Sequence, residues 1–201
     1  MIKAKIAVLV SGGGTNLQAL IDAQNSGIIK SGEISLVISN KPDAYALTRA
    51  KNAGISTLVI EKAGNAERFE SDLITALEEN KIDLIVLAGF MCILSERFTS
   101  RFANRILNVH PSLIPSFCGA GFYGLKVHEA ALGYGVKVTG ATVHFVNEIP
   151  DGGKIILQKA VEILDGDTPE VLQKRVMEQA EWKILPEATE MVAKQICEKG
   201  E

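Results

Sequence analysis

The sequence predicts an α/β fold of the doubly wound class, in which a mostly parallel, Rossmann-like sheet carries an antiparallel extension in its C-terminal half. Apolar runs alternate with segments of helical spacing through the first half of the chain, which is the pattern of parallel strands and crossover helices. A glycine-rich turn follows the first apolar run, and two later strand-like runs are joined by a short turn containing proline and glycine. A chain of 201 residues, 47% of them hydrophobic, has the size and composition of one globular domain.

Four apolar runs in the first half predict strands that are buried on both faces, because they are rich in Val, Ile and Leu and nearly continuous in apolarity. The segments between them have helical spacing, as in the series Phe69, Leu73 and Leu77. Strands and helices therefore alternate, which implies a parallel sheet. The strand runs are 6–10, 34–39, 56–60 and 84–88, and the helical segments are 16–26, 45–53 and 67–79.

The second half of the chain departs from this alternation. Its last two strand-like runs are expected to pair as a hairpin-like extension of the sheet. Thr168 and Pro169 suit the N-cap and the first position of a final helix, which we expect to run to about Lys183 before Pro186 interrupts it. The predicted elements are a strand at 106–110, a glycine-rich loop at 118–124, a helix at 125–132 and strands at 138–146 and 155–164.

The composition excludes several classes of function. Lys and Arg number 21 against 24 Asp and Glu, and there is no basic run, so neither nucleic acid nor a membrane surface is an expected partner. The first apolar run is too short for a secretion signal, and no stretch approaches the roughly 18 apolar residues of a membrane span. The three cysteines have no paired spacing. We therefore expect a cytoplasmic protein with reduced thiols.

A glycine-rich turn, Ser11 to Asn16, joins the first predicted strand to the first predicted helix. The backbone N–H groups of such a turn and the dipole of the helix favour an anion, and a small phosphate fits near Gly13, Gly14, Thr15 and Asn16. The turn lacks the third glycine of a dinucleotide fingerprint and the Lys-Ser/Thr pair of a P-loop, so no nucleotide cofactor is expected. A tight turn that binds no ligand is the alternative.

Asn108 and His110 come at the end of the strand-like run 106–110, where open α/β sheets bind their ligands. Because they are two residues apart in an extended segment, their side chains project from one face. An amide that donates to an oxyanion and an imidazole that titrates near neutral pH are the groups that acyl transfer to an amine requires. Asp151 lies in a Pro-Asp-Gly-Gly turn, where it is either an ordinary turn residue or a carboxylate that folds back to orient His110.

The other two histidines give no sign of a metal site. His128 falls in a predicted helix and His144 in a predicted strand, where a structural role is at least as expected as a chemical one. The three histidines lack the HxxxH or HxH spacing of metal ligands, and the cysteines do not complete such a set. No metal is therefore expected.

Several segments of the chain match a known family. They are 8–18 (VLVSGGGTNLQ), 39–41 (SNK), 87–91 (LAGFM), 108–115 (NVHPSLIP), 143–146 (VHFV) and 151–153 (DGG). The chain thereby resembles the phosphoribosylglycinamide formyltransferases, folate-dependent enzymes of purine biosynthesis, over nearly its whole length. The Asn-x-His-Pro-Ser segment followed by Asp-Gly-Gly is highly specific for folate formyl transfer, although the wider superfamily shares it.

The resemblance implies a reaction and a domain organisation. The formyl group of the co-substrate 10-formyltetrahydrofolate would pass to the amine of glycinamide ribonucleotide, giving formylglycinamide ribonucleotide and tetrahydrofolate in de novo IMP synthesis. The chain would be a single formyltransferase domain, 1–201, with a phosphate-binding half at 1–100 and a catalytic and folate-binding half at 101–201. We expect a monomer or a homodimer.

The resemblance also implies which residues form the site. The catalytic set is Asn108, His110 and Asp151, and Glu181 in the last helix would meet the amine of the substrate. The phosphate would lie on Gly14, Thr15 and Asn16 beside Gly13. Cys92 stands where the family often has arginine, and Lys154 replaces a usual proline, where its charge is expected to lower the pKa of Asp151. The folate pterin would lie among Met91, Cys92, Ile93, Leu94, Val146 and Asn147.

Three related enzymes and one binding protein are the alternatives. In a formyltetrahydrofolate hydrolase water replaces the amine, but that family usually has an extra amino-terminal domain. An initiator-tRNA formyltransferase would have a basic surface, which this acidic chain lacks. An amino-sugar nucleotide is another possible amine acceptor. A phosphoribosyl or folate binding module without activity is the fourth alternative, and the complete set of Asn108, His110 and Asp151 counts against it.

Overall fold

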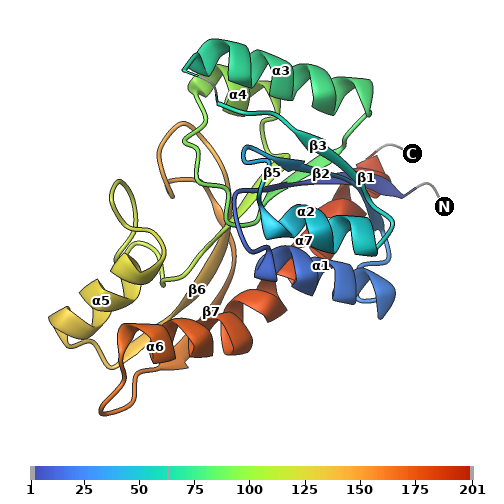
Figure 1. Ribbon diagram of the computed structural model, residues 1–201. Coiled ribbons are helices and arrows are strands. Elements are labelled where there is room, and N and C mark those ends of the chain that lie inside the picture. Colours follow the sequence, from blue (N-terminus) through green and yellow to red (C-terminus); the bar gives the residue numbers. More distant parts are fainter. Residues whose placement is uncertain (1–2, 63, 200–201) are drawn as a thin grey trace.

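The computed structural model describes residues 3–62 and 64–199 and forms one seven-stranded sheet flanked by helices (Figure 1). Its strands are β1 (Ala4–Val10), β2 (Gly32–Ser39), β3 (Ser56–Val59), β4 (Leu84–Leu87), β5 (Ile106–His110), β6 (Val138–Phe145) and β7 (Ile155–Glu162). Its helices are α1 (Thr15–Asn25), α2 (Tyr45–Asn52), α3 (Ala66–Glu79), α4 (Glu96–Arg101), α5 (Leu125–Tyr134), α6 (Pro169–Val176) and α7 (Trp182–Lys199), with a π-helical turn, Met177–Glu181, between the last two.

The sheet has the strand order β3-β2-β1-β4-β5-β6-β7, which confirms the predicted doubly wound architecture. Strands β1 to β5 pair in parallel, and the strand order reverses at β1, between β2 and β4. β6 then runs antiparallel to β5, and β7 runs antiparallel to β6. The predicted antiparallel extension is therefore confirmed, and it adds two strands to one edge of the parallel sheet.

Two hydrophobic clusters cover the two faces of the sheet. Alternate residues of β1 divide between them, with Ile6 and Val8 in the first cluster and Ala7 and Leu9 in the second. The first cluster packs under α1, α2 and α7, and the second packs under α3 and α4, on the opposite face of the sheet in Figure 1. β1 is thus buried on both faces, as its apolar run predicts.

Strand β3 is less buried than its apolar run predicts. The run 56–60 was expected to be buried on both faces, but Leu58 and Val59 are exposed and Thr57 is only partly buried. The reason is position in the sheet, because β3 is an edge strand that pairs, among the strands of residues 3–62 and 64–199, with β2 alone. An apolar run predicts a strand, and the number of its neighbours decides how much of it is buried.

The C-terminal helical region also differs from its prediction. Thr168 caps α6 as expected, because its side chain accepts a hydrogen bond from the N–H of Val171. Pro186, however, does not interrupt the helix and lies buried inside α7. The N–H that it lacks would bond the carbonyl of Trp182, at the junction with the π-helical turn, where the register of helical hydrogen bonds already changes.

We predict opposite effects of alanine at two glycines. A Cβ on Gly140 in β6 would lie 2.1 Å from the carbonyl oxygen of Lys159 in β7, whereas a Cβ on Gly133 in α5 would meet no atom within 4 Å. Gly140→Ala should therefore lower the free energy of unfolding by about 1–3 kcal/mol, since β6 and β7 must separate. Gly133→Ala should raise it by about 0.5–1 kcal/mol, because glycine weakens a helix. Urea denaturation measures both, and an unchanged Gly140→Ala variant would contradict this packing.

Candidate active site

The candidate site lies on the face of β5 and β6 that continues the second hydrophobic cluster. Ile106 of β5 belongs to that cluster, and Asn108 and His110 share its face because side chains alternate along a strand. The antiparallel register sets Asn108 opposite His144 and His110 opposite Thr142. This face of the sheet is therefore apolar beneath α3 and α4. On β5 and β6 the same face carries the polar side chains of Asn108, His110 and His144.

His110 is nearly buried and faces acceptors on both sides of its ring. Its Nδ1 lies 3.5 Å from Oδ2 of Asp151, and its Nε2 lies 2.9 Å from the carbonyl oxygen of Phe117. A neutral imidazole can donate to only one of these acceptors, whereas the protonated ring donates to both. The structure thus brings His110 and Asp151 together, and the loop after β5 supplies a contact that the sequence did not indicate.

Asp151 is both a turn residue and part of this cluster. Its backbone has a positive φ of 57° in the turn between β6 and β7, and its carboxylate accepts a hydrogen bond from the N–H of Gly119 at 2.8 Å. Burial disfavours its charged form, but hydrogen bonds from His144 and Gly119 and the nearby His110 outweigh burial and lower the pKa of Asp151. These groups, rather than Lys154, lower its pKa.

His144 is the site residue whose position the sequence left open. Its Nδ1 lies 2.8 Å from the carbonyl oxygen of Phe145, so this nitrogen carries a proton in the neutral ring. In the neutral ring the other nitrogen, Nε2, accepts from Nδ2 of Asn108 at 3.3 Å, and in the protonated ring it faces Oδ1 of Asp151 at 3.6 Å as a donor instead. His144 therefore holds the amide of Asn108 in one orientation. The signal that would have found it is the register of β6 against β5.

The glycine-rich turn lies at the carboxyl end of β1 and is held from behind by α2. The N–H of Ala46 donates to the carbonyl oxygen of Gly12 at 3.0 Å, and Nε of Arg49 donates to that of Gly13 at 2.8 Å. Gly14 has a φ of 72°, and a Cβ there would lie 2.6 Å from the Cβ of Ala46. Because α2 binds the carbonyls, the turn presents the amino end of α1 on its other side, where an anion is favoured. Sequence reasoning missed Arg49, whose charge favours the same anion.

Glu181 reaches this turn from the far end of the chain. Its Oε2 accepts a hydrogen bond of 2.7 Å from Nδ2 of Asn16, and both side chains are buried. Burial raises the pKa of Glu181, and the single bond from Asn16 only partly opposes it. Glu181 ends the π-helical turn, an irregularity that is frequent at functional sites.

The segment that follows β4 divides into an exposed part and a buried part. Met91 is 57% exposed and Ile93 is 74% exposed, whereas Leu94 is only 5% exposed and belongs to the second hydrophobic cluster. Cys92 and Val146 are partly buried and pack against that same cluster. Asn147 accepts from the N–H of Ile149 in the following turn. Leu94 is thus buried in the core on this face, and its place in the folate pocket stays a prediction.

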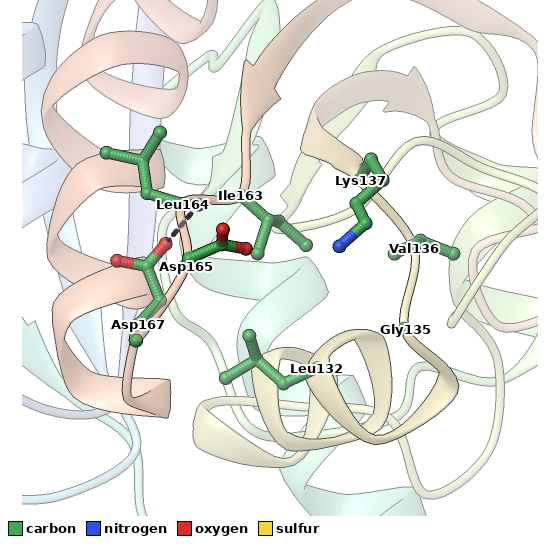
Figure 2. A pocket seen from close by; sticks show the side chains of 9 residues that line it. Leu132, Gly135, Val136, Lys137, Ile163, Leu164, Asp165 and Asp167 are labelled. Carbon is green, nitrogen blue, oxygen red and sulfur yellow. Dashed lines mark hydrogen bonds between the residues drawn. The ribbon is translucent and has the colours of Figure 1, made fainter.

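Two hollows lie outside the histidine cluster. A cavity of about 660 Å³ lies between α1 and α7, where Thr15, Gln18, Arg49 and Trp182 line it, so it begins beside the glycine-rich turn. A smaller one of about 180 Å³ lies at the other end of β6 from His144, with the side chains of Lys137 and Asp165 turned toward it (Figure 2). The smaller hollow contains none of the predicted site residues.

Two further properties concern metals and membranes. Within residues 3–62 and 64–199, no group of three or more His, Cys, Asp or Glu side chains is arranged to hold a metal ion. In the same part of the chain, no helix has both the length and the apolar character needed to span a membrane.

Fold and site together define a doubly wound α/β protein with a glycine-rich turn at the amino end of α1 and an amide–imidazole–carboxylate group, as expected of an acyl-group transferase. Residues 4–189 match the family model for formyl transferase, and the chain belongs to the formyl transferase family.

The names of similar proteins and solved structures are consistent with this family. The chain is 48% identical to phosphoribosylglycinamide formyltransferase of Haemophilus influenzae over 184 residues, which are 90% of this chain and 84% of that protein. It is also 48% identical to the human trifunctional purine biosynthetic protein adenosine-3, covering 99% of this chain but only 19% of the relative's length. The crystal structure of glycinamide ribonucleotide transformylase 1 from Symbiobacterium toebii superposes with a TM-score of 0.89 at 43% identity, covering 96% of this chain and 89% of that one.

The buried Glu181 gives a prediction for the pH dependence of stability. Because its pKa is higher in the folded state than its ordinary value, it stabilises the fold fully at low pH and less as the pH rises through the folded pKa. Glu181→Gln removes this loss and should gain free energy of unfolding over wild type above about pH 4.5, by at most about 1.4 kcal/mol per pH unit. Urea unfolding at pH 4, 6 and 8 measures the difference.

The matched control is Glu187→Gln, which changes an exposed glutamate on the same helix. Its stability should run parallel to that of wild type across the same pH range. A Glu181→Gln variant that also runs parallel would contradict the raised pKa of Glu181.

Proposed function

We propose that this protein transfers the formyl group of 10-formyltetrahydrofolate to the amine of glycinamide ribonucleotide, giving formylglycinamide ribonucleotide and tetrahydrofolate in de novo purine synthesis. The observation that carries this proposal is the cluster in which Asn108, His110 and Asp151 are connected, directly or through His144. The names of the relatives support the substrates, since several are phosphoribosylglycinamide formyltransferases.

The first step of the proposed reaction forms the new carbon–nitrogen bond. The amine of the substrate attacks the formyl carbon, and the formyl oxygen becomes an oxyanion. The amide of Asn108 has two N–H groups, one of which bonds His144, so the second can donate to this oxyanion. The protonated ring of His110 supplies the positive charge beside it. Holding both substrates in line contributes a further part of the rate.

The second step breaks the bond between the formyl carbon and the folate nitrogen. The attacking amine must lose a proton, and the departing nitrogen must gain one. Asp151 is charged at neutral pH because its pKa is lowered, so it stabilises the imidazolium of His110 and helps to move this proton, directly or through water. No covalent intermediate on the protein is required.

The two substrates would approach the cluster from two sides. The phosphate of the ribonucleotide would bind at Gly13, Gly14, Thr15 and Asn16, where Arg49 adds positive charge. Glu181 is bonded to Asn16 and would meet the amine end of the same substrate. The exposed apolar side chains of Met91 and Ile93 suit the flat pterin ring of the folate, with Cys92, Val146 and Asn147 beside them.

This division of roles supports one domain, 1–201, in which 1–100 binds phosphate and 101–201 binds folate and performs catalysis. Two observations modify it. Met91 and Cys92 belong to the first half, and Glu181 of the second half contacts Asn16 of the first. The cytoplasmic location and the monomer or homodimer state stay predictions.

A spectrophotometric assay of folate release from 10-formyltetrahydrofolate, with and without glycinamide ribonucleotide, tests the proposal. We expect release that requires the amine, and a loss of about 10²–10⁴-fold in His110→Ala, since a general acid is removed. Release without the amine would instead indicate hydrolysis. Release only with an amino-sugar nucleotide would indicate that other acceptor, and tight binding without release would indicate a binding module.

Asn108 provides a second test. Asn108→Ala removes the donor to the oxyanion and should lower kcat by about 10²–10³-fold, as other oxyanion-hole variants do. Asn52→Ala is the control, because Asn52 is an exposed asparagine at the end of α2. Thermal unfolding of both variants checks that they fold. Unaltered turnover of Asn108→Ala would contradict its role.

A further inference from the structure

Ser11 joins two segments that the proposed function assigns to different substrates. It is the first residue after β1, directly before Gly12, and is only 5% exposed. Its Oγ donates to Oδ1 of Asn40 at 2.7 Å and accepts from the backbone N–H of Met91 at 2.8 Å. The hydroxyl therefore bonds once in each direction, and both of its partners lie in other loops.

Asn40 completes the connection. It follows β2, and its Nδ2 donates to Sγ of Cys92 at 3.2 Å. Burial raises the pKa of the Cys92 thiol, so the sulfur is neutral at pH 7 and acts as a weak acceptor. Met91 and Cys92 are adjacent in the chain, so the hydrogen bonds form a closed ring through Ser11 and Asn40.

The ring lies where the strand order of the sheet reverses. It links the loops that follow β1, β2 and β4, and β1 stands between the other two strands. Met91 and Ile93 are largely exposed, but Ala88 and Leu94 are buried and Phe90 packs against the second cluster, so the core holds the segment on both sides of Met91. The bond from the N–H of Met91 to Ser11 therefore does not hold the segment alone, but it ties the exposed part of the segment directly to the residue before the glycine-rich turn.

We propose that Ser11 and Asn40 are positioning residues that set the distance between the glycine-rich turn and the folate segment, and so align the amine with the formyl group. This inference rests on the proposed function. Neither side chain needs to touch either reacting atom. A shift of about 1 Å between two bound substrates can cost about 10²-fold in rate, so a ring that holds both loops has a direct effect on turnover.

Ser11→Ala tests the proposal because it should change the binding of each substrate little and lower turnover strongly. The binding constant of each substrate alone, measured by calorimetry, should change by less than about threefold, because each loop keeps its other contacts. The kcat with both substrates should fall by about tenfold or more, because the two loops lose their common frame. Ser11→Thr keeps the hydroxyl and should restore turnover. Weaker binding of the ribonucleotide alone with intact kcat would overturn the proposal.

A double-mutant cycle adds a readout that a purely structural role would not move. Asn40→Ala should lower kcat as Ser11→Ala does, and the double variant should lose no more than the worse single variant, because both break one ring. Losses that simply multiply would overturn the proposal. Ser26→Ala is the matched control, since the hydroxyl of Ser26 also donates a hydrogen bond, but to the carbonyl oxygen of Ala23 at the C-terminal end of α1. Its kcat should stay unchanged.

Amide hydrogen exchange separates this inference from the proposed function. The N–H of Met91 should exchange slowly in wild type and about tenfold or more faster in Ser11→Ala, whether or not the chain is active. If the wild-type chain does not formylate the ribonucleotide, only the proposed function is contradicted. The exchange rate of the Met91 N–H would still test whether the ring of hydrogen bonds holds this segment. Equal exchange in both proteins would overturn the inference.

Discussion

The antiparallel pairing of β6 with β5 is the constraint on which the candidate site depends. It puts His144 directly opposite Asn108, so that a ring nitrogen accepts from the amide. It also sends the chain into the turn before β7, where Asp151 folds back to His110. A parallel strand in this position would require a long crossover connection and could not return a turn residue to the face of its neighbour. The change of strand direction therefore creates the cluster.

The carboxylates of Asp151 and Glu181 show how the surroundings of a group decide its charge. Burial favours the neutral form of both, but Asp151 has an N–H and two imidazoles around it, whereas Glu181 has one neutral amide. Their pKa values therefore shift in opposite directions. The charged carboxylate of Asp151 favours a proton on the neighbouring histidine. The carboxyl of Glu181, which protonates more readily, can accept or donate a hydrogen bond beside an uncharged part of a substrate.

The sequence predicted those features that depend on neighbours along the chain. The glycine-rich turn, the strand at 106–110 and the cap at Thr168 each follow from local residue types, and each is confirmed. Features that depend on register or on sheet position were not predictable in this way. His144 became part of the cluster only through its partner on β5, and β3 became exposed only because nothing pairs with its outer edge. Leu94 looks like its neighbours Ile93 and Met91, yet packing buries it alone.

The return of the chain to its beginning explains why the site needs the whole molecule. α7 packs on the face of the sheet that α1 covers, and the π-helical turn before it carries Glu181 to Asn16. The start of α1 is therefore bounded by α2, which binds the carbonyls of the turn, and by a carboxyl group from the other end of the sequence. Because these contacts come from distant segments, neither half of the chain could form the glycine-rich turn and its surroundings alone. The same long-range contacts fix the position of the turn relative to the polar face of β5 and β6. Transfer of a group between two bound molecules requires such a fixed arrangement.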